Sequence, residues 1–477
     1  MAAGGAHGRP APVAVSDTSV LPGSMTVGRV AGQGDDPMSI APPNESVVED
    51  RLAAAPPPGR TVVELMRDRA TGPGADRPLF TALGAAGEPM ASLTAAELDA
   101  RARVVADALY RTGRPGDRVI VPPMPGLDFH VAFFGCLYAG MVAVPVPDAA
   151  GPVVAAITRD SRADAVLVPD AAGPGSVPGV SRVVVRVPVR ASRHRRGTPV
   201  APDPLAPALL HYATRPGRRA QWGVAVGHGA LVAGQAAVRD RCDIDAGTTV
   251  VSWLPLWHGT GLATALVLPL VSGAAAVTLE PVAFVRDPRV WLRAIEAEED
   301  VFAAAPDSAY ELCVRRVPEA DRMRIDLSTW RVAAVGGGAG AGGGRTVGAR
   351  TLRRFADAFR PGFFREEVFA AGYSTGGGAL GVTLARPLYP TVAGHYDRAA
   401  LARGRAVPVP RAGRGGVELV GRGTPLPGVG VRVVDPASRR AVPERVVGEI
   451  WVDVPGDAVG RTGDLGFLDG GELFVTG

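Results

Sequence analysis

The chain carries cationic side chains of one kind only. Its 477 residues include 51 that are lysine or arginine, and every one of them is an arginine. A guanidinium group spreads its charge over a planar fork of donors, whereas lysine presents a compact ammonium. We therefore expect no step on this chain that needs an amine side chain as a donor or a nucleophile.

One stretch, residues 212–223, combines residue types that can hold phosphate. Thr214 has a hydroxyl group, Gly217 has no side chain to cover its backbone N–H, and Arg215 brings positive charge. Backbone N–H groups of small residues beside a cation form anion sites, although Pro216 removes one such donor. The stretch predicts either a modified phosphate loop or a solvated surface turn, the usual fate of a charged run.

Composition and charge exclude several other classes. A hydrophobic share of 47% and a charged share of 21% indicate a globular protein with two or three cores. The net charge is only +4, and most of the arginines are interleaved with Asp and Glu. Nucleic acid needs a more clustered basic surface, so we expect no nucleic-acid partner.

The cysteines and the apolar runs predict neither a zinc site nor a membrane span. Cys136, Cys242 and Cys313 are far apart and form no C-x-x-C pair. A sparse, odd number of cysteines fits a reducing compartment, so we predict a cytoplasmic location. The longest apolar runs, such as residues 262–271, are too short to cross a bilayer.

Alternating strand and helix patterns fill most of the chain. Capping boxes at Thr61-Val-Val-Glu64 and Thr94-Ala-Ala-Glu97 each predict the start of a helix. Helical patterns then separate short apolar runs, which predict strands at 119–121, 142–146, 165–168, 183–187, 209–212, 250–254, 274–279, 301–305 and 330–335. Such alternation indicates a parallel sheet covered on both faces.

The order of these patterns predicts an α/β fold with two doubly wound, mostly parallel α/β lobes and a small antiparallel β-rich lobe. Residues 1–57 are rich in Gly, Ala, Pro and Ser, and we expect a disordered extension there. The expected boundaries are 58–200 for the first lobe, 205–385 for the second and 388–477 for the β-rich lobe. A hairpin signal at Asp469-Gly470 supports the last assignment.

Several motifs resemble one known family. Ser252-Trp-Leu-Pro-Leu-Trp-His258 and Arg461-Thr-Gly-Asp-Leu-Gly466 are similar to segments of the adenylate-forming (AMP-binding, acyl-CoA synthetase-like) superfamily. Phe134-Gly-Cys-Leu-Tyr-Ala-Gly140 and Tyr310-Glu-Leu-Cys-Val-Arg-Arg316 are typical of its fatty acyl-AMP ligase branch. The resemblance runs from about residue 61 to the end of the chain.

This resemblance implies a reaction and its partners. Members of the branch use ATP to convert a fatty acid to an acyl-adenylate, and they pass the acyl group to an acyl carrier protein. We therefore expect a fatty acid as substrate, ATP or AMP as ligand and an acyl carrier protein as partner. The family fold ends in a mobile C-terminal domain that bears a catalytic lysine, and we expect this domain to be absent here.

The resemblance also assigns roles to individual residues. It places Tyr373 on the adenine and Asp464 on the ribose hydroxyls, with Thr214, Arg215 and Gly217 in the phosphate loop. His258 matches a histidine near the acyl end of the site and is our candidate catalytic residue. The acyl pocket is expected to contain Trp257, His258 and Phe302.

Each of these roles has a structural alternative. An aromatic residue such as Tyr373 at a strand end often serves only packing. Asp464 is also suited to capping a tight turn, and His258 to being a half-buried histidine without a chemical role.

The chain departs from the family pattern where phosphate and metal would be held. Gly377 stands where the family has a magnesium-binding Glu, and a glycine has no side-chain oxygen to ligate a hard cation. The phosphate loop lacks its lysine, and residues 336–344 are almost all glycine. We therefore expect a degenerate copy that binds ATP or AMP weakly, has no protein metal site and little use for magnesium, and is weakly active or inactive. Two alternatives remain: a non-catalytic module that binds an acyl chain or a carrier protein, and an active ligase completed by a C-terminal domain in trans.

Overall fold

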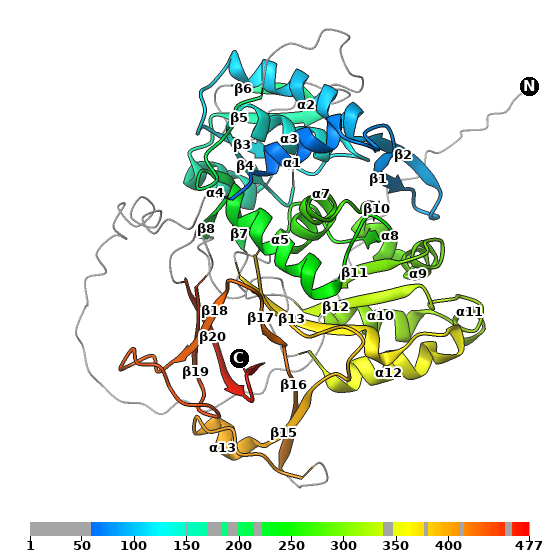
Figure 1. Cartoon of the computed structure of the whole chain (residues 1–477), viewed down its shortest axis with the longest axis vertical. Coiled ribbons are helices and arrows are strands. Elements are labelled where there is room, and N and C mark those ends of the chain that lie inside the picture. Colours follow the sequence, from blue (N-terminus) through cyan, green and yellow to red (C-terminus); the bar gives the residue numbers. More distant parts are fainter. Residues whose placement is uncertain are drawn as a thin grey trace, which may run out of the picture. The chain divides into compact units, whose positions relative to one another are not determined.

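The computed structural model describes residues 59–148, 151–169, 183–187, 199–213, 222–336, 347–375, 380–410, 415–453 and 460–476. The expected disordered extension at residues 1–57 lies outside the described residues. The described residues form two large sheets with helices on their faces and a smaller antiparallel part (Figure 1). The α/β fold class predicted from the sequence is confirmed.

The first sheet has six strands in the order β6-β5-β3-β4-β7-β8. All neighbours are parallel except the hairpin of β7 and β8. The strands are β3 (Arg118–Val121), β4 (Val142–Pro145), β5 (Ala165–Pro169), β6 (Val183–Val187), β7 (Pro207–Ala213) and β8 (Trp222–Gly227).

Four helices accompany this sheet: α1 (Val62–Thr71), α2 (Ala95–Tyr110), α3 (Asp128–Tyr138) and α4 (Pro152–Ser161). Both predicted capping boxes are confirmed, at the start of α1 and of α2. Helix α3 is buried on nearly all sides and packs closely against α2. The glycine at Gly135 permits this approach, because a Cβ there would lie 2.5 Å from Val105 of α2.

The second sheet has nine strands in the order β17-β14-β13-β12-β11-β9-β10-β1-β2, and the pairs from β13 to β1 are parallel. Its strands are β1 (Pro78–Leu83), β2 (Pro89–Thr94), β9 (Thr249–Ser252), β10 (Ala275–Leu279), β11 (Val301–Ala305), β12 (Trp330–Gly336), β13 (Phe369–Thr375), β14 (Leu380–Leu384) and β17 (Thr424–Pro425). Its helices are α5 (His228–Cys242), α6 (Gly259–Leu262), a π-helix at Ala263–Val267, α7 (Leu268–Ser272), α8 (Pro281–Arg286), α9 (Arg289–Glu296), α10 (Asp307–Arg316), α11 (Glu319–Arg322) and α12 (Ala349–Phe359).

The second sheet is buried on both faces. Successive side chains of a strand point to opposite faces, and in β11 Phe302 joins the core that contains α5, whereas Val301 and Ala303 join the other core. That other core is rich in aromatic rings, with Trp291, Tyr310 and Trp330 at its centre. Figure 1 shows the sheet between α5 and α12.

The β-rich part contains the sheet β18-β19-β20-β21, the pair β15 and β16, and one short helix. Its elements are β15 (Ala393–Asp397), α13 (Arg398–Ala402), β16 (Gly416–Val420), β18 (Gly430–Val434), β19 (Gly448–Asp453), β20 (Gly460–Asp469) and β21 (Glu472–Val475). All its strand pairs are antiparallel, as the sequence predicts. Phe467 and Phe474 stack in its core, and Tyr396 lies edge-on against both rings.

The sheet pairing crosses the expected lobe boundaries in three places. Strands β7 and β8 follow residue 205 but pair in the first sheet, and the hairpin of β1 and β2 lies before residue 200 but pairs in the second. Strand β17, beyond residue 388, also joins the second sheet. An apolar pattern predicts that a segment is a strand. Which sheet the strand joins depends on the tertiary structure.

Histidine His130 of α3 makes the fold sensitive to acid. It is fully buried against Phe80, and neither ring nitrogen has a hydrogen-bond partner among the described residues. Burial, and then the positive charge of Arg101, lower the pKa of His130 to about 3. The unfolded chain takes up this proton below about pH 6.5 and the folded chain does not, so acid lowers the free energy of unfolding.

We therefore expect His130→Leu to lose less stability on acidification than the unchanged chain. Between neutral pH and about pH 5 the difference should be about 2 kcal/mol, because the proton uptake of the unfolded state at this position is removed. Urea unfolding of both proteins at the two pH values measures it. An equal loss in both proteins would contradict the assignment.

Candidate active site

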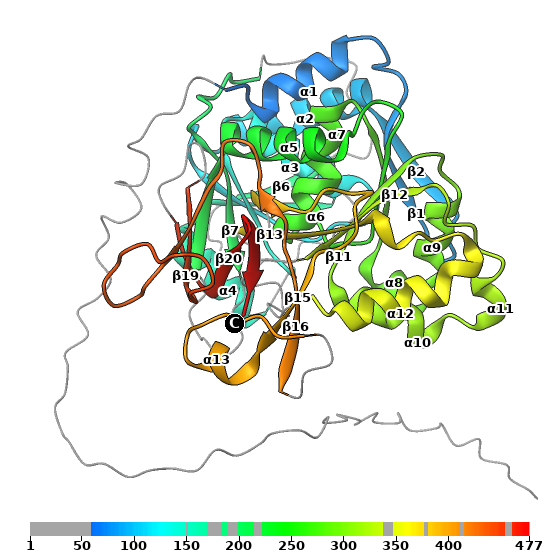
Figure 2. The same ribbon diagram turned by 60° about the horizontal axis from the view of Figure 1, so that its bottom comes forward.

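Tyr373 and Asp464 meet at the junction of the second sheet and the β-rich part. The Tyr373 hydroxyl donates a hydrogen bond of 2.6 Å to Oδ2 of Asp464, across 91 residues of sequence. The tyrosine is 4% exposed and the aspartate is half-buried. Figure 2 shows their strands, β13 and β20, side by side. Two residues that the sequence assigned to one nucleoside are thus brought together.

An irregularity in the pairing of β20 with β19 surrounds Asp464. The Thr462 hydroxyl donates to the Ile450 carbonyl oxygen at 2.7 Å and accepts from the Asp464 backbone N–H at 3.1 Å. Gly463 between them has a φ of +75°, which a side chain would strain. These contacts fix the backbone of β20 at this point, so the carboxylate of Asp464 reaches Tyr373 from a defined position. Asp464 lies within β20, beside an irregularity in its pairing with β19, and not in the tight turn that its structural alternative supposes.

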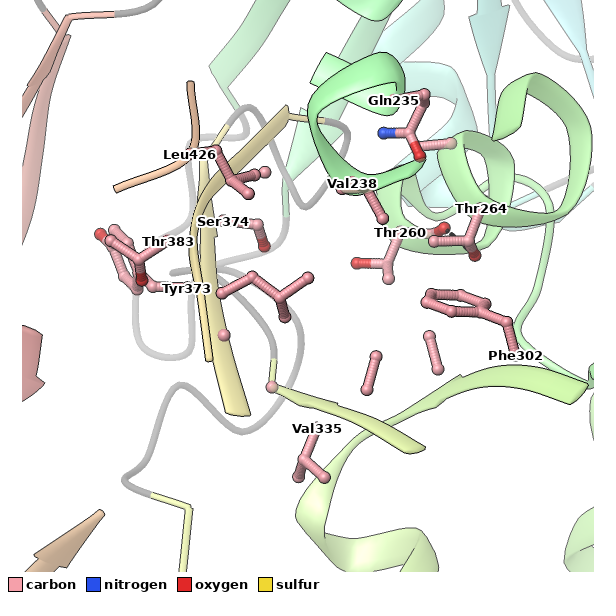
Figure 3. A pocket seen from close by; sticks show the side chains of 17 residues that line it. Gln235, Val238, Thr260, Thr264, Phe302, Val335, Tyr373, Ser374, Thr383 and Leu426 are labelled. Atoms are coloured by element: carbon pink, nitrogen blue, oxygen red, sulfur yellow. Dashed lines mark hydrogen bonds between the residues drawn. The ribbon is translucent and has the colours of Figure 1, made fainter. Parts of the chain in front are cut away.

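An apolar cavity of about 80 Å³ lies beside this pair. Figure 3 shows one wall with Gln235, Val238, Thr260 and Thr264 and the opposite wall with Ser374 and Leu426. Phe302, one of the three expected acyl-pocket residues, lines the cavity. Trp257 and His258 do not line it, although Thr260, two residues after His258, does.

His258 is the N-cap of α6. Its Nδ1 accepts a hydrogen bond of 3.3 Å from the Thr260 backbone N–H, and burial lowers its pKa. A neutral imidazole that accepts through Nδ1 carries its proton on Nε2, so it can donate to a ligand oxygen. Its ring lies 6.2 Å from that of Trp257, centroid to centroid.

His211 of β7 supports this turn, and sequence reasoning missed it. Its Nε2 accepts a hydrogen bond of 3.0 Å from the Gly259 backbone N–H, the residue after His258. Burial, and then the nearby His258, lower the pKa of His211 to about 4, so its ring is neutral near pH 7. The signal was a lone polar residue between Leu210 and Tyr212 in an otherwise apolar strand.

Several expected site residues cannot be placed. Thr214, Arg215 and Gly217 of the phosphate loop lie outside the described residues, as do Gly377 and residues 337–346. In the described part of the chain, no group of three or more His, Cys, Asp or Glu side chains could hold a metal ion. Nor does any helix described there have the length and apolar character needed to cross a membrane.

The family profile described as "AMP-binding enzyme" matches residues 67–212 and 221–460 of this chain. These two ranges include Tyr373, His258 and all strands of the second sheet. The chain belongs to this AMP-binding family.

Its relatives place it in the fatty acyl-AMP ligase branch. It is 31% identical over 433 residues to a long-chain-fatty-acid–AMP ligase of Mycobacterium marinum, covering 81% of this chain and 72% of that protein. It is 29% identical over 439 residues to a medium-chain-fatty-acid–[acyl-carrier-protein] ligase of Moorena producens, covering 81% and 71%. A 4-hydroxyphenylalkanoate adenylyltransferase of Mycobacterium marinum is 31% identical over 442 residues, covering 81% and 68%.

Solved structures of the branch share the fold of this AMP-binding chain. The crystal structure of fatty acid AMP ligase from Legionella pneumophila matches with a TM-score of 0.80 and 27% identity, over 87% of this chain and 76% of that one. A fatty acyl-adenylate ligase from the same organism, in complex with acyl adenylate and pyrophosphate, matches with a TM-score of 0.77 and 26% identity, over 87% and 77%. The resemblance predicted from the sequence motifs is confirmed.

Proposed function

We propose that this chain holds a fatty acyl-adenylate and forms it much more slowly than fatty acyl-AMP ligases with a complete set of phosphate and magnesium ligands. The observation that carries the proposal is the Tyr373–Asp464 pair beside an apolar cavity lined by Phe302. A buried ring offers a face to adenine and a carboxylate offers two acceptors to ribose hydroxyls. The cavity takes an apolar chain.

The acyl end of the proposed site is supplied by the turn at His258. Its neutral ring, kept in one orientation by the Thr260 N–H, presents Nε2–H as a donor to an oxygen of the acyl group or the α-phosphate. The Gly259 N–H is already bonded to His211. In this proposal His258 orients the ligand oxygen and stabilises the negative charge that develops on it, through the hydrogen bond that Nε2–H donates.

The slow rate follows from what the phosphate and metal side lacks. The chain contains no lysine, and Gly377 has no carboxylate for magnesium. A charge-assisted hydrogen bond contributes about 1.5–3 kcal/mol, and each 1.4 kcal/mol of lost transition-state stabilisation is about tenfold in rate. Loss of two such contacts, about 3–6 kcal/mol together, predicts a rate lower by about a hundred- to ten-thousandfold, with about a thousandfold in the middle of this range.

The proposed partner is an acyl carrier protein, and the proposed location is the cytoplasm. One relative is named as a ligase that acts on an acyl carrier protein. All three cysteines are unpaired and buried, which suits a reducing compartment. Burial raises the pKa of the Cys242 thiol to about 12, so it is not a nucleophile that accepts an acyl group itself.

Calorimetric titration with AMP and ATP tests the proposal. AMP should bind about as tightly as ATP, and adding magnesium should change the ATP affinity by less than about threefold, because the adenosine contacts persist while the metal ligand is missing. ATP binding that is tight and requires magnesium would contradict the account of the phosphate side. Absence of AMP binding would contradict the role of Tyr373 and Asp464.

A further inference from the structure

The wall of the cavity formed by α5 contains a buried polar side chain with an unmet hydrogen-bonding need. Gln235 is 2% exposed, and its Oε1 has no hydrogen-bond partner among the described residues. It lines the cavity together with Val238, one turn further along α5 (Figure 3). A buried carbonyl oxygen without a hydrogen-bond partner destabilises the free protein. Gln235 therefore lowers stability unless a ligand or a water donates to its Oε1.

A second polar group that lines the same cavity also lacks a hydrogen-bond partner. The Oγ1 of Thr260 is buried without a partner in the part of the chain that the structure describes. The Thr264 hydroxyl, by contrast, is satisfied, because it donates to the Thr260 carbonyl oxygen at 2.7 Å. Gln235 and Thr260 come from α5 and α6, so two separate elements each present an unpaired polar atom to one cavity.

The rest of the described lining does not satisfy these atoms. Much of it is apolar, and its polar members Thr264, Tyr373, Ser374 and Thr383 make no hydrogen bond to Oε1 of Gln235 or Oγ1 of Thr260. An unbranched hydrocarbon chain in this cavity would leave Gln235 and Thr260 dry and unpaired. A hydroxyl group on the ligand would donate its proton to Oε1 of Gln235 and accept a hydrogen bond from the hydroxyl of Thr260.

We propose that the acyl substrate of this chain carries an uncharged hydrogen-bonding group, a hydroxyl on its chain or ring, which Gln235 and Thr260 recognise. This inference rests on the proposed function, because it assigns the cavity to the acyl chain. Sites built to bond a substrate hydroxyl discriminate strongly against the analogue that lacks it, since the buried polar groups are then left unpaired. Gln235 is therefore a specificity-determining residue.

The test is calorimetric binding of matched carboxylic acids to the full chain without nucleotide. The probes are dodecanoic acid, its ω-hydroxy and mid-chain hydroxy forms, and a phenylalkanoic acid with and without a 4-hydroxyl. At least one hydroxylated acid should bind about tenfold or more tightly than its plain counterpart. In Gln235→Leu the preference should fall to within about threefold, while the plain acid binds at least as well as before.

Val238→Ala is the matched control, because it changes the same wall and removes no polar atom. It should alter the affinities of the plain and hydroxylated acids by the same factor. Gln235→Leu keeps about the same volume and removes an unpaired group, so it should melt at or above the temperature of the unchanged chain.

Two outcomes would overturn the inference. The first is equal binding of plain and hydroxylated acids throughout the panel. This result is expected if an ordered water donates a hydrogen bond to Oε1 of Gln235. The second is a preference that survives Gln235→Leu. Either would leave the proposed function standing, whereas failure of every acid to bind would contradict the assignment of the cavity to the acyl chain.

Discussion

Replacing Asp464 by alanine is expected to weaken AMP binding by about 10- to 150-fold. In the proposed site the carboxylate accepts from the ribose hydroxyls, and a hydrogen bond to a charged group contributes about 1.5–3 kcal/mol. The same change removes the acceptor of the Tyr373 hydroxyl, which lies 2.6 Å from Oδ2. The ring loses its anchor as well, so the loss of affinity should lie toward the upper end of this range.

Strand β20 provides a matched control for this variant. Asp469, five residues along the same strand, accepts a hydrogen bond of 2.9 Å from the Tyr396 hydroxyl. Asp469→Ala therefore breaks a tyrosine–aspartate pair of the same kind in the core of the β-rich part, away from the cavity. It should lower the melting temperature and leave AMP affinity within about twofold.

Titration of the two variants with AMP separates a binding role from a structural one. Tyr373→Phe adds a third point, because it keeps the ring and removes only the hydroxyl. We expect it to weaken AMP binding less than Asp464→Ala does. Equal affinities for AMP in Asp464→Ala and Asp469→Ala would show that Asp464 has only a structural role.

The sequence predicts the architecture well because the signals that carry it are local. The capping boxes at Thr61 and Thr94 contain both of the residues that make the cap, so four consecutive residues suffice to predict each helix start. Short apolar runs likewise mark the buried strands of both sheets. Strands β1 and β7 pair across the expected lobe boundaries, because each adds to a sheet edge whose position no local pattern encodes.

Sequence motifs also single out Tyr373 and Asp464, and the structure joins the two side chains across 91 residues. Gln235 carries no such signal, because a glutamine within a helical pattern usually faces solvent. Only the packing of α5 against the π-helix shows that it is buried, and only the cavity shows that Oε1 lacks a partner.

The proposed function also predicts the largest effect, which concerns turnover. Adenylation by this chain should be slower by about a thousandfold than that of a fatty acyl-AMP ligase with both the loop lysine and the magnesium-binding glutamate. The reason is electrostatic. This chain has no ammonium group to stabilise the charge that develops on the phosphates, and residue 377 has no carboxylate to bind magnesium.

A restored variant makes this prediction sharper. Trp222→Lys combined with Gly377→Glu returns a lysine before Gly223 and a carboxylate to the metal position. If these losses limit the rate, the double variant should be faster than the unchanged chain by about tenfold or more and should gain a dependence on magnesium. Trp222→Leu with Gly377→Gln is its uncharged control and should gain neither.

Carboxylate-dependent release of pyrophosphate measures adenylation by the purified full chain directly. The assay is run with the plain and hydroxylated acids, with and without magnesium, beside a ligase that carries both residues. Release should proceed at about a thousandth of the comparator's rate, with little response to magnesium. Magnesium-dependent release within about tenfold of the comparator would contradict this prediction.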